Sequence, residues 1–359
     1  MPKLLIITHH RKDRSPGQRF RFEQYLDFLS TNGYEITFSN FINESDDRVF
    51  YGAGNILGKI KVVLKNIFIR ISNVLSANKY DVILIYREAF VFGTTIFEYL
   101  LSKSKAKLIY DFDDSIWLLD VSTGNKAFSF LKSPDKTKKI IGYCDMITVG
   151  NEYLANYARQ YNSNVKIIPT TIDTSYHLNK NKQTKTRICV GWTGTDTTAK
   201  HFEYLLHTLE KLYKKFPNIY FKMICDRAIS YPSLNLESTK WNKETEIEQL
   251  TEIDIGIMPL PDDKWANGKC GFKGLQYMSL EIATIMSPVG VNTEIIQQGI
   301  NGFLASTEEE WLDKLTLLIE NEELRLLLGK AGRKTIENKY SVKAWENKYL
   351  EYYNELVKK

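Results

Sequence analysis

The sequence predicts an α/β protein with two Rossmann-like domains facing a cleft. Short runs rich in Ile and Val alternate with longer amphipathic segments, as in parallel sheets covered by helices. This alternation is interrupted by the polar, Lys- and Asn-rich residues 170–186 and then resumes. The length of 359 residues also favours two domains, because single cores rarely grow beyond about 250–300 residues.

The expected elements follow from apolar periodicity. Buried strands are expected at residues 3–8, 34–39, 81–86, 106–111, 145–149 and 164–169, and then at 187–193, 219–225, 254–260 and 282–287. Helices are expected near residues 17–31, 56–77, 91–102 and 151–160, and then at 198–215, 244–251, 273–281, within 307–337 and at 342–357. These elements divide the chain into a first domain (1–170), a linker (171–186), a second domain (187–340) and a last helical segment (341–359).

The composition is that of an ordinary globular enzyme, with 43% hydrophobic and 25% charged residues. A net charge of +5 suits an anionic ligand or a membrane surface, but it is too small and too scattered to indicate a nucleic-acid partner. The four cysteines lie far apart, and no His/Cys group has zinc-ligand spacing. No signal peptide or membrane-spanning run is visible. We therefore expect a cytoplasmic protein without a metal or cofactor.

Candidate ligand-binding residues follow the strands of the first half. In open α/β sheets, ligands bind beyond the carboxyl ends of the strands. Gly17, Arg19 and Arg21 follow the first strand, where they suit an anion or form a solvated basic loop. No GxGxxG follows this strand, which argues against a dehydrogenase. Arg87 and Glu88 follow the third strand, either as an ion pair at the cleft or as surface charges.

Three aspartates follow the fourth strand, in the segment YDFDDSIW. Carboxylates this close repel one another, so the group predicts metal binding, contact with sugar hydroxyls or action as a base. Helix capping is the alternative for one of the three. The candidates for catalysis are Asp111, Asp113 and Asp114.

Two segments of the second half predict phosphate sites at helix N-termini. The segment GKCGFKGLQYM (268–278) places Lys269 and Lys273 around Gly271 and Phe272, where an apolar, helix-like stretch begins. Such a helix start combines a positive dipole end with closely approachable backbone.

The second of these segments follows the strand at 187–193 and has small, hydroxyl-bearing residues before a helix. Its candidate residues are Thr193, Gly194, Thr195 and Lys200. Capping is the alternative role for the hydroxyl groups. Two anion sites in one domain suit a diphosphate better than a single phosphate.

These residues resemble a known family. Residues 269–305 are similar to the donor-binding signature of GT-B retaining glycosyltransferases of family 4. YDFDDSIW and GWTGT resemble a bacterial subgroup associated with surface polysaccharides. The signature positions that match are Leu275, Met278, Pro288, Val289, Gly290, Glu294, Asn301 and Gly302.

The resemblance implies a nucleotide-sugar donor in the second domain and a saccharide or lipid-linked acceptor in the first. It also implies metal-independent transfer with retention, and a final helix that returns to the first domain. Gln276 takes the position of the family's second glutamate, which contacts the ribose, and Gly268 takes that of the first glutamate. The second substitution leaves open how the donor sugar is held, and it keeps open a non-catalytic nucleotide-sugar-binding protein as an alternative function. A nucleotide-sugar 2-epimerase on the same fold is a further alternative.

The segment 56–77 predicts a helix with an apolar stripe and no acidic residue. The stripe is expected at Ile56, Ile60, Val63, Ile67, Ile71 and Val74, with positive charges at Lys59, Lys61, Lys65 and Arg70. This pattern is typical of a helix lying on an anionic membrane surface, which would place the protein at the inner face of the cell membrane. A helix packed on a parallel sheet shows a similar pattern.

Overall fold

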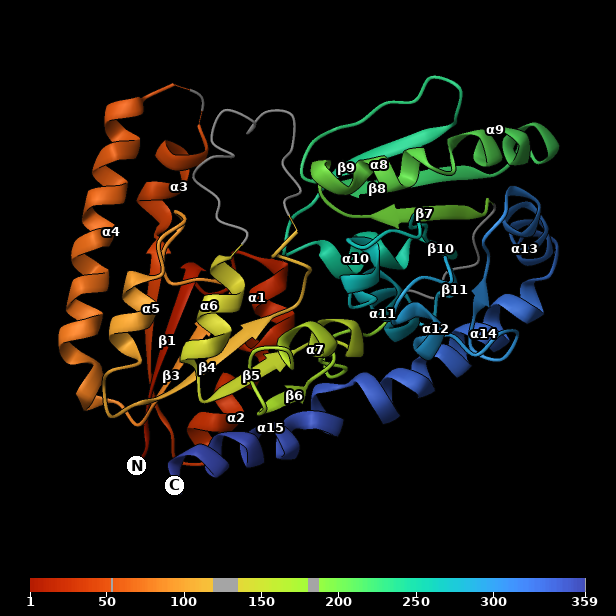
Figure 1. The fold of residues 1–359 in the computed structure, drawn as a ribbon. Helices are drawn as coiled ribbons and strands as arrows, with labels where there is room; N and C mark the ends of the chain where they lie inside the picture. The colour runs from red at the N-terminus through yellow and green to blue at the C-terminus, as the bar shows by residue number, and fades with distance from the viewer. Residues whose placement is uncertain (53, 119–134, 180–186, 359) are drawn as a thin grey trace. The chain divides into compact units, whose positions relative to one another are not determined.

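The computed structural model describes residues 1–52, 54–118, 135–179 and 187–358, which form two compact units. The first unit contains Met1–Pro169 and Trp345–Lys359, and the second contains Thr170–Ala344. Each unit has a parallel sheet with helices on its faces (Figure 1). The prediction of an α/β fold with two Rossmann-like domains is confirmed.

The sheet of the first unit is parallel throughout and has the order β2-β1-β3-β4-β5-β6 within the described residues. Its strands are β1 (Lys3–His10), β2 (Glu35–Ile42), β3 (Val82–Tyr86), β4 (Lys107–Phe112), β5 (Met146–Val149) and β6 (Val165–Ile167). Because β2 and β3 lie on opposite sides of β1, the winding of the chain reverses between β1 and β3. Open sheets bind ligands at such a reversal, beyond the carboxyl ends of the strands.

The helices of the first unit are α1 (Pro16–Arg21), α2 (Leu26–Thr31), α3 (Glu44–Tyr51), α4 (Ile56–Ser76), α5 (Ile96–Leu101), α6 (Lys136–Tyr143), α7 (Glu152–Ala158) and α15 (Val342–Val357). The helical segment expected near residues 17–31 is divided, because Phe22 leaves the helical region with φ −131° and separates α1 from a short 3-10 helix at Glu23–Tyr25. Helix α3, which was not expected, begins at a capping box in which Asn43 accepts a hydrogen bond from the Asp46 backbone N–H.

The final helix α15 belongs to the first unit, as expected. The ring of Tyr349 stacks on that of Tyr25, with the ring centroids 4.2 Å apart. The hydroxyl of Tyr34 donates a hydrogen bond to the side-chain oxygen of Asn354 at 2.9 Å. Two segments more than 300 residues apart in the sequence therefore share one core.

The sheet of the second unit is also parallel and has the order β12-β11-β10-β7-β8-β9 within the described residues. Its strands are β7 (Cys189–Thr193), β8 (Tyr220–Cys225), β9 (Leu236–Lys240), β10 (Ile255–Met258), β11 (Ala283–Met286) and β12 (Phe303–Leu304). The winding reverses between β7 and β10. The edge strand β9 was not expected, because its sequence LESTK is polar and half exposed.

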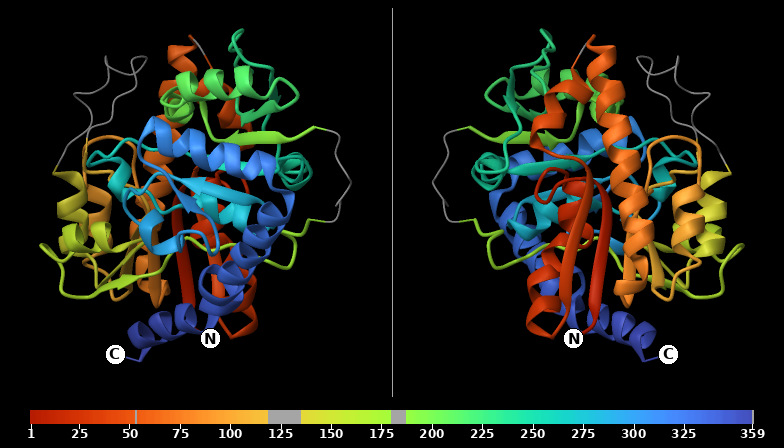
Figure 2. Two further views of the ribbon diagram at one scale, coloured as in Figure 1. Left: turned by 90° about the vertical axis from the view of Figure 1, so that its right-hand side faces the viewer. Right: turned by 90° about the vertical axis from the view of Figure 1, so that its left-hand side faces the viewer.

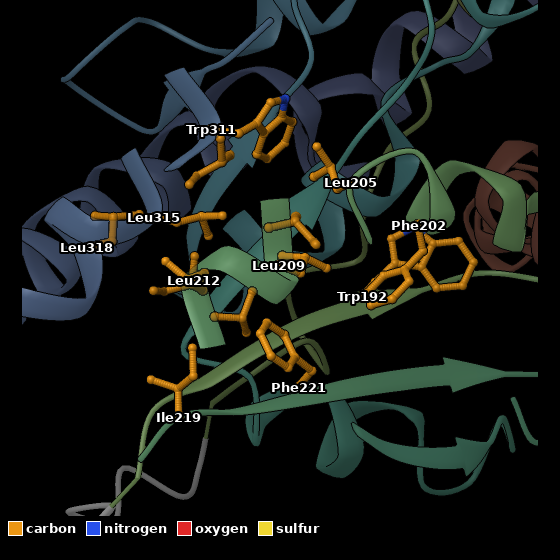
Figure 3. Packing of buried hydrophobic residues seen from close by; sticks show 14 of the residues in the cluster. Trp192, Phe202, Leu205, Leu209, Leu212, Ile219, Phe221, Trp311, Leu315 and Leu318 are labelled. Carbon is orange, nitrogen blue, oxygen red and sulfur yellow. The ribbon is translucent and has the colours of Figure 1, made fainter. Parts of the chain in front are cut away.

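The helices of the second unit are α8 (Ala199–Glu203), α9 (Leu206–Lys215), α10 (Glu246–Thr251), α11 (Phe272–Ser279), α12 (Asn292–Ile295), α13 (Glu308–Glu320) and α14 (Glu322–Thr335). On one face of the sheet, Leu209 of α9 and Trp311 and Leu315 of α13 pack in one buried cluster with Trp192 of β7 and Phe221 of β8 (Figure 3). This packing fixes β7, and with it the loop that follows β7.

The segment expected to be a linker is described only at residues 171–179, and this part lies in the second unit. The backbone N–H of Ile172 donates to the carbonyl of Tyr340 at 2.8 Å. Arg333 donates hydrogen bonds to the carbonyls of Thr174 and His177. The described part of the segment is therefore packed against the helices that end the second unit.

Candidate functional site

The loop after β7 is held in one position at the winding reversal of the second unit. The backbone N–H of Thr193 donates a hydrogen bond to the hydroxyl of Tyr277, on α11, at 2.9 Å. At Gly194, an added Cβ would lie 2.2 Å from the ring of Trp192, so only glycine fits there. Thr195 then caps the 3-10 helix Asp196–Thr198 through reciprocal bonds with Thr198. The strand end thus presents a rigid, small-residue loop.

The charges of three lysines act on His201 of α8 in the same unit. His201 is buried, and its Nδ1 has no hydrogen-bond partner among the described residues. Its pKa is lowered to about 4, first by burial and then by nearby positive charges, whereas Asp263 acts in the opposite direction. In order of effect, those charges belong to Lys273, Lys269 and Lys200. The lysines predicted from two separate segments are therefore brought together around one neutral imidazole.

Two of these lysines lie over tryptophan rings. The Nζ of Lys273 is 5.5 Å from the ring centroid of Trp192, and the Nζ of Lys269 is 5.3 Å from that of Trp265. Both side chains flank the start of α11, whose cap Gly271 has φ +71°. An added Cβ on Gly271 would lie 2.3 Å from the side chain of Ile295, so the backbone approaches α12 closely. Phe272 is the first residue of the helix. Lysines beside a helix N-terminus are chemically suited to binding an anion.

Gln276 lies away from solvent in a buried polar network. Its Nε2 donates a hydrogen bond to Oε1 of Glu246 at 3.1 Å, and the indole Nε1 of Trp241 donates to the same oxygen at 3.1 Å. Glu246 starts α10 and was not predicted as a site residue. Its partner Gln276 lies thirty residues away in the sequence, so no local motif indicated this contact.

In the first unit, Arg87 binds two of the three predicted catalytic aspartates. Its Nε and Nη2 donate to Oδ1 of Asp113 at 3.0 and 2.7 Å, and Nη2 also donates to Oδ2 of Asp114 at 2.8 Å. The hydroxyl of Tyr86 donates to Asp113 at 3.0 Å. Gly17 lies against this group, since an added Cβ there would lie 2.4 Å from the Tyr86 hydroxyl. The ends of β3 and β4 and the start of α1 therefore meet at one cluster.

Asp111, by contrast, is a buried structural residue. It accepts hydrogen bonds from Nε and Nη2 of Arg21 at 3.1 and 2.7 Å, and from the hydroxyl of Thr148 at 2.6 Å. Arg21 also donates to the carbonyl of Ile168, and both charged groups are almost completely buried. The interpretation of Asp111 as a catalytic group and of Arg21 as an acceptor contact is therefore corrected to a buried ion pair that joins α1, β4 and β5.

The two remaining candidates of the first unit have local partners. Arg19 is buried, with its guanidinium carbon 5.1 Å from the ring centroid of Phe20. Glu88 accepts a hydrogen bond from Nζ of Lys136 at 2.7 Å, and Lys136 also donates to the carbonyl of Phe92. Glu88 therefore holds the start of α6 and does not join the Arg87–Asp113 cluster.

His9 and His10, at the end of β1, were not predicted as site residues. Their Nε2 atoms lie 3.0 and 3.5 Å from the hydroxyl of Tyr51. Burial and the charge on His10 are the two largest causes that lower the pKa of His9 to about 3, and Arg87 lowers it as well. Burial and the charge on Arg14 are the two largest causes that lower the pKa of His10 to about 4. Both imidazoles are therefore neutral near pH 7 and can exchange hydrogen bonds with hydroxyl groups. The sequence signal that could have identified them as site residues is the pair of polar side chains at the end of a buried strand.

Among residues 1–52, 54–118, 135–179 and 187–358, no group of three or more His, Cys, Asp or Glu side chains is arranged to hold a metal ion.

Comparison with known proteins agrees with this architecture. The family model "Glycosyl transferases group 1" matches residues 185–321, within the second unit. No curated protein matches the chain. The structure is similar to a glycosyltransferase from Rickettsia africae, with a TM-score of 0.70 and 15% identity over 99% of both chains.

Two further solved structures are similar over the whole chain. Sucrose-phosphate synthase from Thermosynechococcus elongatus has a TM-score of 0.68 and 12% identity, over 99% of this chain and 98% of that one. HepE from Anabaena, solved in complex with UDP and glucose, has a TM-score of 0.66 and 12% identity over 99% and 100%. At these identities the likeness shows the fold alone. The fold is that of GT-B glycosyltransferases, and the second unit carries a glycosyl transferases group 1 domain.

Proposed function

We propose that the protein is a metal-independent glycosyltransferase of the hexosyltransferase type, belonging to the retaining family 4. It moves a sugar from a nucleoside-diphosphate sugar to a saccharide or lipid-linked acceptor during synthesis of cell-surface polysaccharide or glycan. The donor binds the second unit and the acceptor binds the first. We further propose that the protein works at the inner face of the cell membrane.

The observation that carries this proposal is the lysine cluster of the second unit. The charges of Lys200, Lys269 and Lys273 all lower the pKa of His201, and α11 begins between Lys269 and Lys273. The matched glycosyl transferases group 1 domain contains all of these residues. A nucleoside diphosphate is the leaving group of sugar transfer, and negative charge develops on it as the sugar–phosphate bond breaks. Fixed positive charges at that point stabilise the transition state.

The neutral state of His201 matters for this chemistry. Three lysines already surround it, so a fourth positive charge is unfavourable until an anion arrives. A bound diphosphate would make protonation of His201 favourable. The Nδ1 atom, which has no partner among the described residues, could then donate a hydrogen bond to a phosphate oxygen. We assign contact with the ribose of the donor to Gln276. Its side-chain oxygen can accept a hydrogen bond from the ribose while its side-chain nitrogen donates to Glu246.

The acceptor hydroxyl must lose a proton as it attacks. Asp113 and Asp114 are the carboxylates assigned to this region, and Arg87 holds both in place. The departing phosphate is the alternative base. Near the same strand ends, the neutral imidazoles of His9 and His10 are suited to orient sugar hydroxyls by hydrogen bonding.

A panel of nucleoside diphosphates and their sugars tests the proposal. We expect one nucleoside diphosphate to raise the melting temperature by several degrees and its sugar to be consumed with release of that diphosphate. A shift without any turnover, with or without acceptors, would instead support the non-catalytic binding protein. Formation of a 2-epimer of the donor sugar would support the epimerase. Inversion of the anomeric carbon in the product would contradict the assignment to a retaining family.

A further inference from the structure

Helix α4 is packed with its polar face inward. Arg70, in the middle of this 21-residue helix, is completely buried. Its guanidinium donates hydrogen bonds to the carbonyls of Ala89 and Thr8 at 2.6 and 3.0 Å and to the hydroxyl of Ser39 at 2.9 Å. Asn66, one turn earlier, is also completely buried. A helix that covers a sheet normally presents apolar side chains to it.

The outward face of α4 is apolar along its whole length. Leu57, Phe68 and Leu75 are 75%, 70% and 80% exposed. The stripe of exposed apolar residues consists of Leu57, Ile60, Leu64, Phe68, Ile71 and Leu75, and Ile56 at the start of the helix is exposed as well. Successive members are three or four residues apart, so they follow one face of the helix over about 27 Å. The stripe expected from the sequence was only partly right, since Val63, Ile67 and Val74 are not among the exposed residues.

Helix α5 extends this surface. It contacts α4, and the two helices lie side by side in the first unit (Figures 1 and 2). Ile96, Tyr99 and Leu100 of α5 are exposed. We call these three residues and the stripe on α4 the α4–α5 surface. An exposed apolar stripe on one helix, with further exposed apolar residues on the helix beside it, is rare on a soluble protein unless something binds there.

The charges around the α4–α5 surface are positive. Residues 48–80 contain no acidic residue, and Lys61 of α4 is exposed beside the stripe. Beyond α5, Lys103 and Lys105 are exposed, and Nζ of Lys103 lies 4.7 Å from the ring centroid of Tyr99. Glu98, the acidic residue of α5, points inward and is buried. A second copy of this surface would bring like charges together, whereas anionic headgroups would meet them with opposite charge.

We propose that the α4–α5 surface binds an anionic lipid bilayer. Helix α4 lies in the plane of the interface, with Leu64 and Phe68 among the acyl chains and the lysines at the headgroups. Arg70 determines this orientation, because its bonds to the sheet keep the polar face of the helix on the protein. The inference rests on the first unit alone, so it stands whether or not the proposed sugar transfer is correct.

Co-sedimentation with vesicles tests this inference directly. Vesicles of pure phosphatidylcholine are compared with vesicles that contain about a third phosphatidylglycerol, at low and high salt. We expect the protein to sediment with the anionic vesicles, to bind them at least about tenfold more weakly at high salt, and to stay in the supernatant with neutral vesicles. A wild-type protein that stays in the supernatant under all conditions would overturn the proposal.

Paired variants locate the binding surface. Leu64→Ser/Phe68→Ser should reduce vesicle binding at least about tenfold, and Lys61→Glu/Lys103→Glu should remove the preference for anionic lipid. The matched control is Leu326→Ser/Leu327→Ser, which removes two exposed leucines from α14 of the second unit. All variants should keep the wild-type circular dichroism spectrum, because the replaced side chains are exposed. If Leu64→Ser/Phe68→Ser binds as well as wild type, the α4–α5 surface is not the binding site. If it instead abolishes a dimer seen by light scattering and wild type ignores vesicles, the occupant is a second copy of the chain.

Discussion

The backbone N–H of Thr193 donates a hydrogen bond to the hydroxyl of Tyr277, and this 2.9 Å contact joins the end of β7 to the middle of α11. Both groups are buried, so neither has water as an alternative partner. The bond links the two predicted phosphate-binding segments of the second unit, which lie more than 80 residues apart in the sequence.

Replacement of Tyr277 by Phe should therefore affect both stability and ligand binding. The unpaired N–H of Thr193 is expected to cost about 1–3 kcal/mol of unfolding free energy, because a buried donor loses its partner. Nucleoside diphosphate affinity should also fall, since the loop after β7 is no longer fixed. Urea denaturation and calorimetry measure the two effects. Tyr204→Phe, at an exposed position, is the control and should change neither.

Lys269→Ala and Lys273→Ala should each weaken nucleoside diphosphate binding by roughly 1.5–3 kcal/mol, the scale of a charge-assisted hydrogen bond. Lys330→Ala, an exposed lysine on α14, should bind as wild type does. Isothermal titration calorimetry gives all three affinities. Unchanged binding in both Lys269→Ala and Lys273→Ala would rule out the lysine cluster as the diphosphate site.

The buried, neutral His201 predicts a pH dependence of stability. Its folded pKa of about 4 lies below the usual value near 6.5, so the unfolded chain binds more protons between these pH values. The contribution of His201 is therefore fully present above about pH 6.5 and is lost as the pH falls toward 4. His201→Gln should show a melting temperature that falls less than that of wild type between pH 7 and pH 4.5. Exposed His207, replaced in the same way, should leave the wild-type profile unchanged.

The three aspartates at the carboxyl end of β4, Asp111, Asp113 and Asp114, should separate into structural and chemical roles. Asp111→Asn leaves Arg21 buried without its counter-charge and is expected to cost about 3–5 kcal/mol of unfolding free energy. Asp113→Asn should lower turnover at least about tenfold while stability changes less, because Arg87 keeps its bond to Asp114. Steady-state kinetics and urea denaturation distinguish the two variants. Equal loss of stability in both would argue that Asp113 is also only structural.

Turnover should continue in excess EDTA, because the lysine cluster supplies the charge that a divalent ion would otherwise bring to the diphosphate. The measurement is release of nucleoside diphosphate before and after chelation. Activity that is lost in EDTA and restored by Mg²⁺ or Mn²⁺ would mean that a metal ion neutralises the leaving group.

Buried parallel strands were predictable because an unbroken Ile- and Val-rich run has few other places in a soluble fold. Strand β9 was not predictable in this way, and neither was the face of α4 that points to solvent. The sequence of α4 is apolar on most sides, so periodicity alone does not tell which face is outward. Only the position of Arg70, whose partners come from β1, β2 and the loop after β3, decides it.

The candidate site, like the fold, was only partly predictable from the sequence. Glycines and lysines at the start of a helix indicate a phosphate site through local geometry, so Lys269, Lys273 and Gly271 could be predicted as candidates. Tyr277, Glu246 and His201 were missed as site residues, because their partners come from distant segments. The burial of Asp111 by Arg21 likewise depends on residues ninety positions apart.

The stacking of Tyr349 on Tyr25 has a consequence for synthesis on the ribosome. Most of the first unit is synthesised before the second unit, yet it is completed by the segment from Trp345 onward, which is synthesised after the second unit. The second unit is a continuous segment and can fold as soon as it emerges, whereas the first unit must wait with part of its core uncovered. A chaperone that holds the nascent chain should therefore be needed longer by the first unit than by the second.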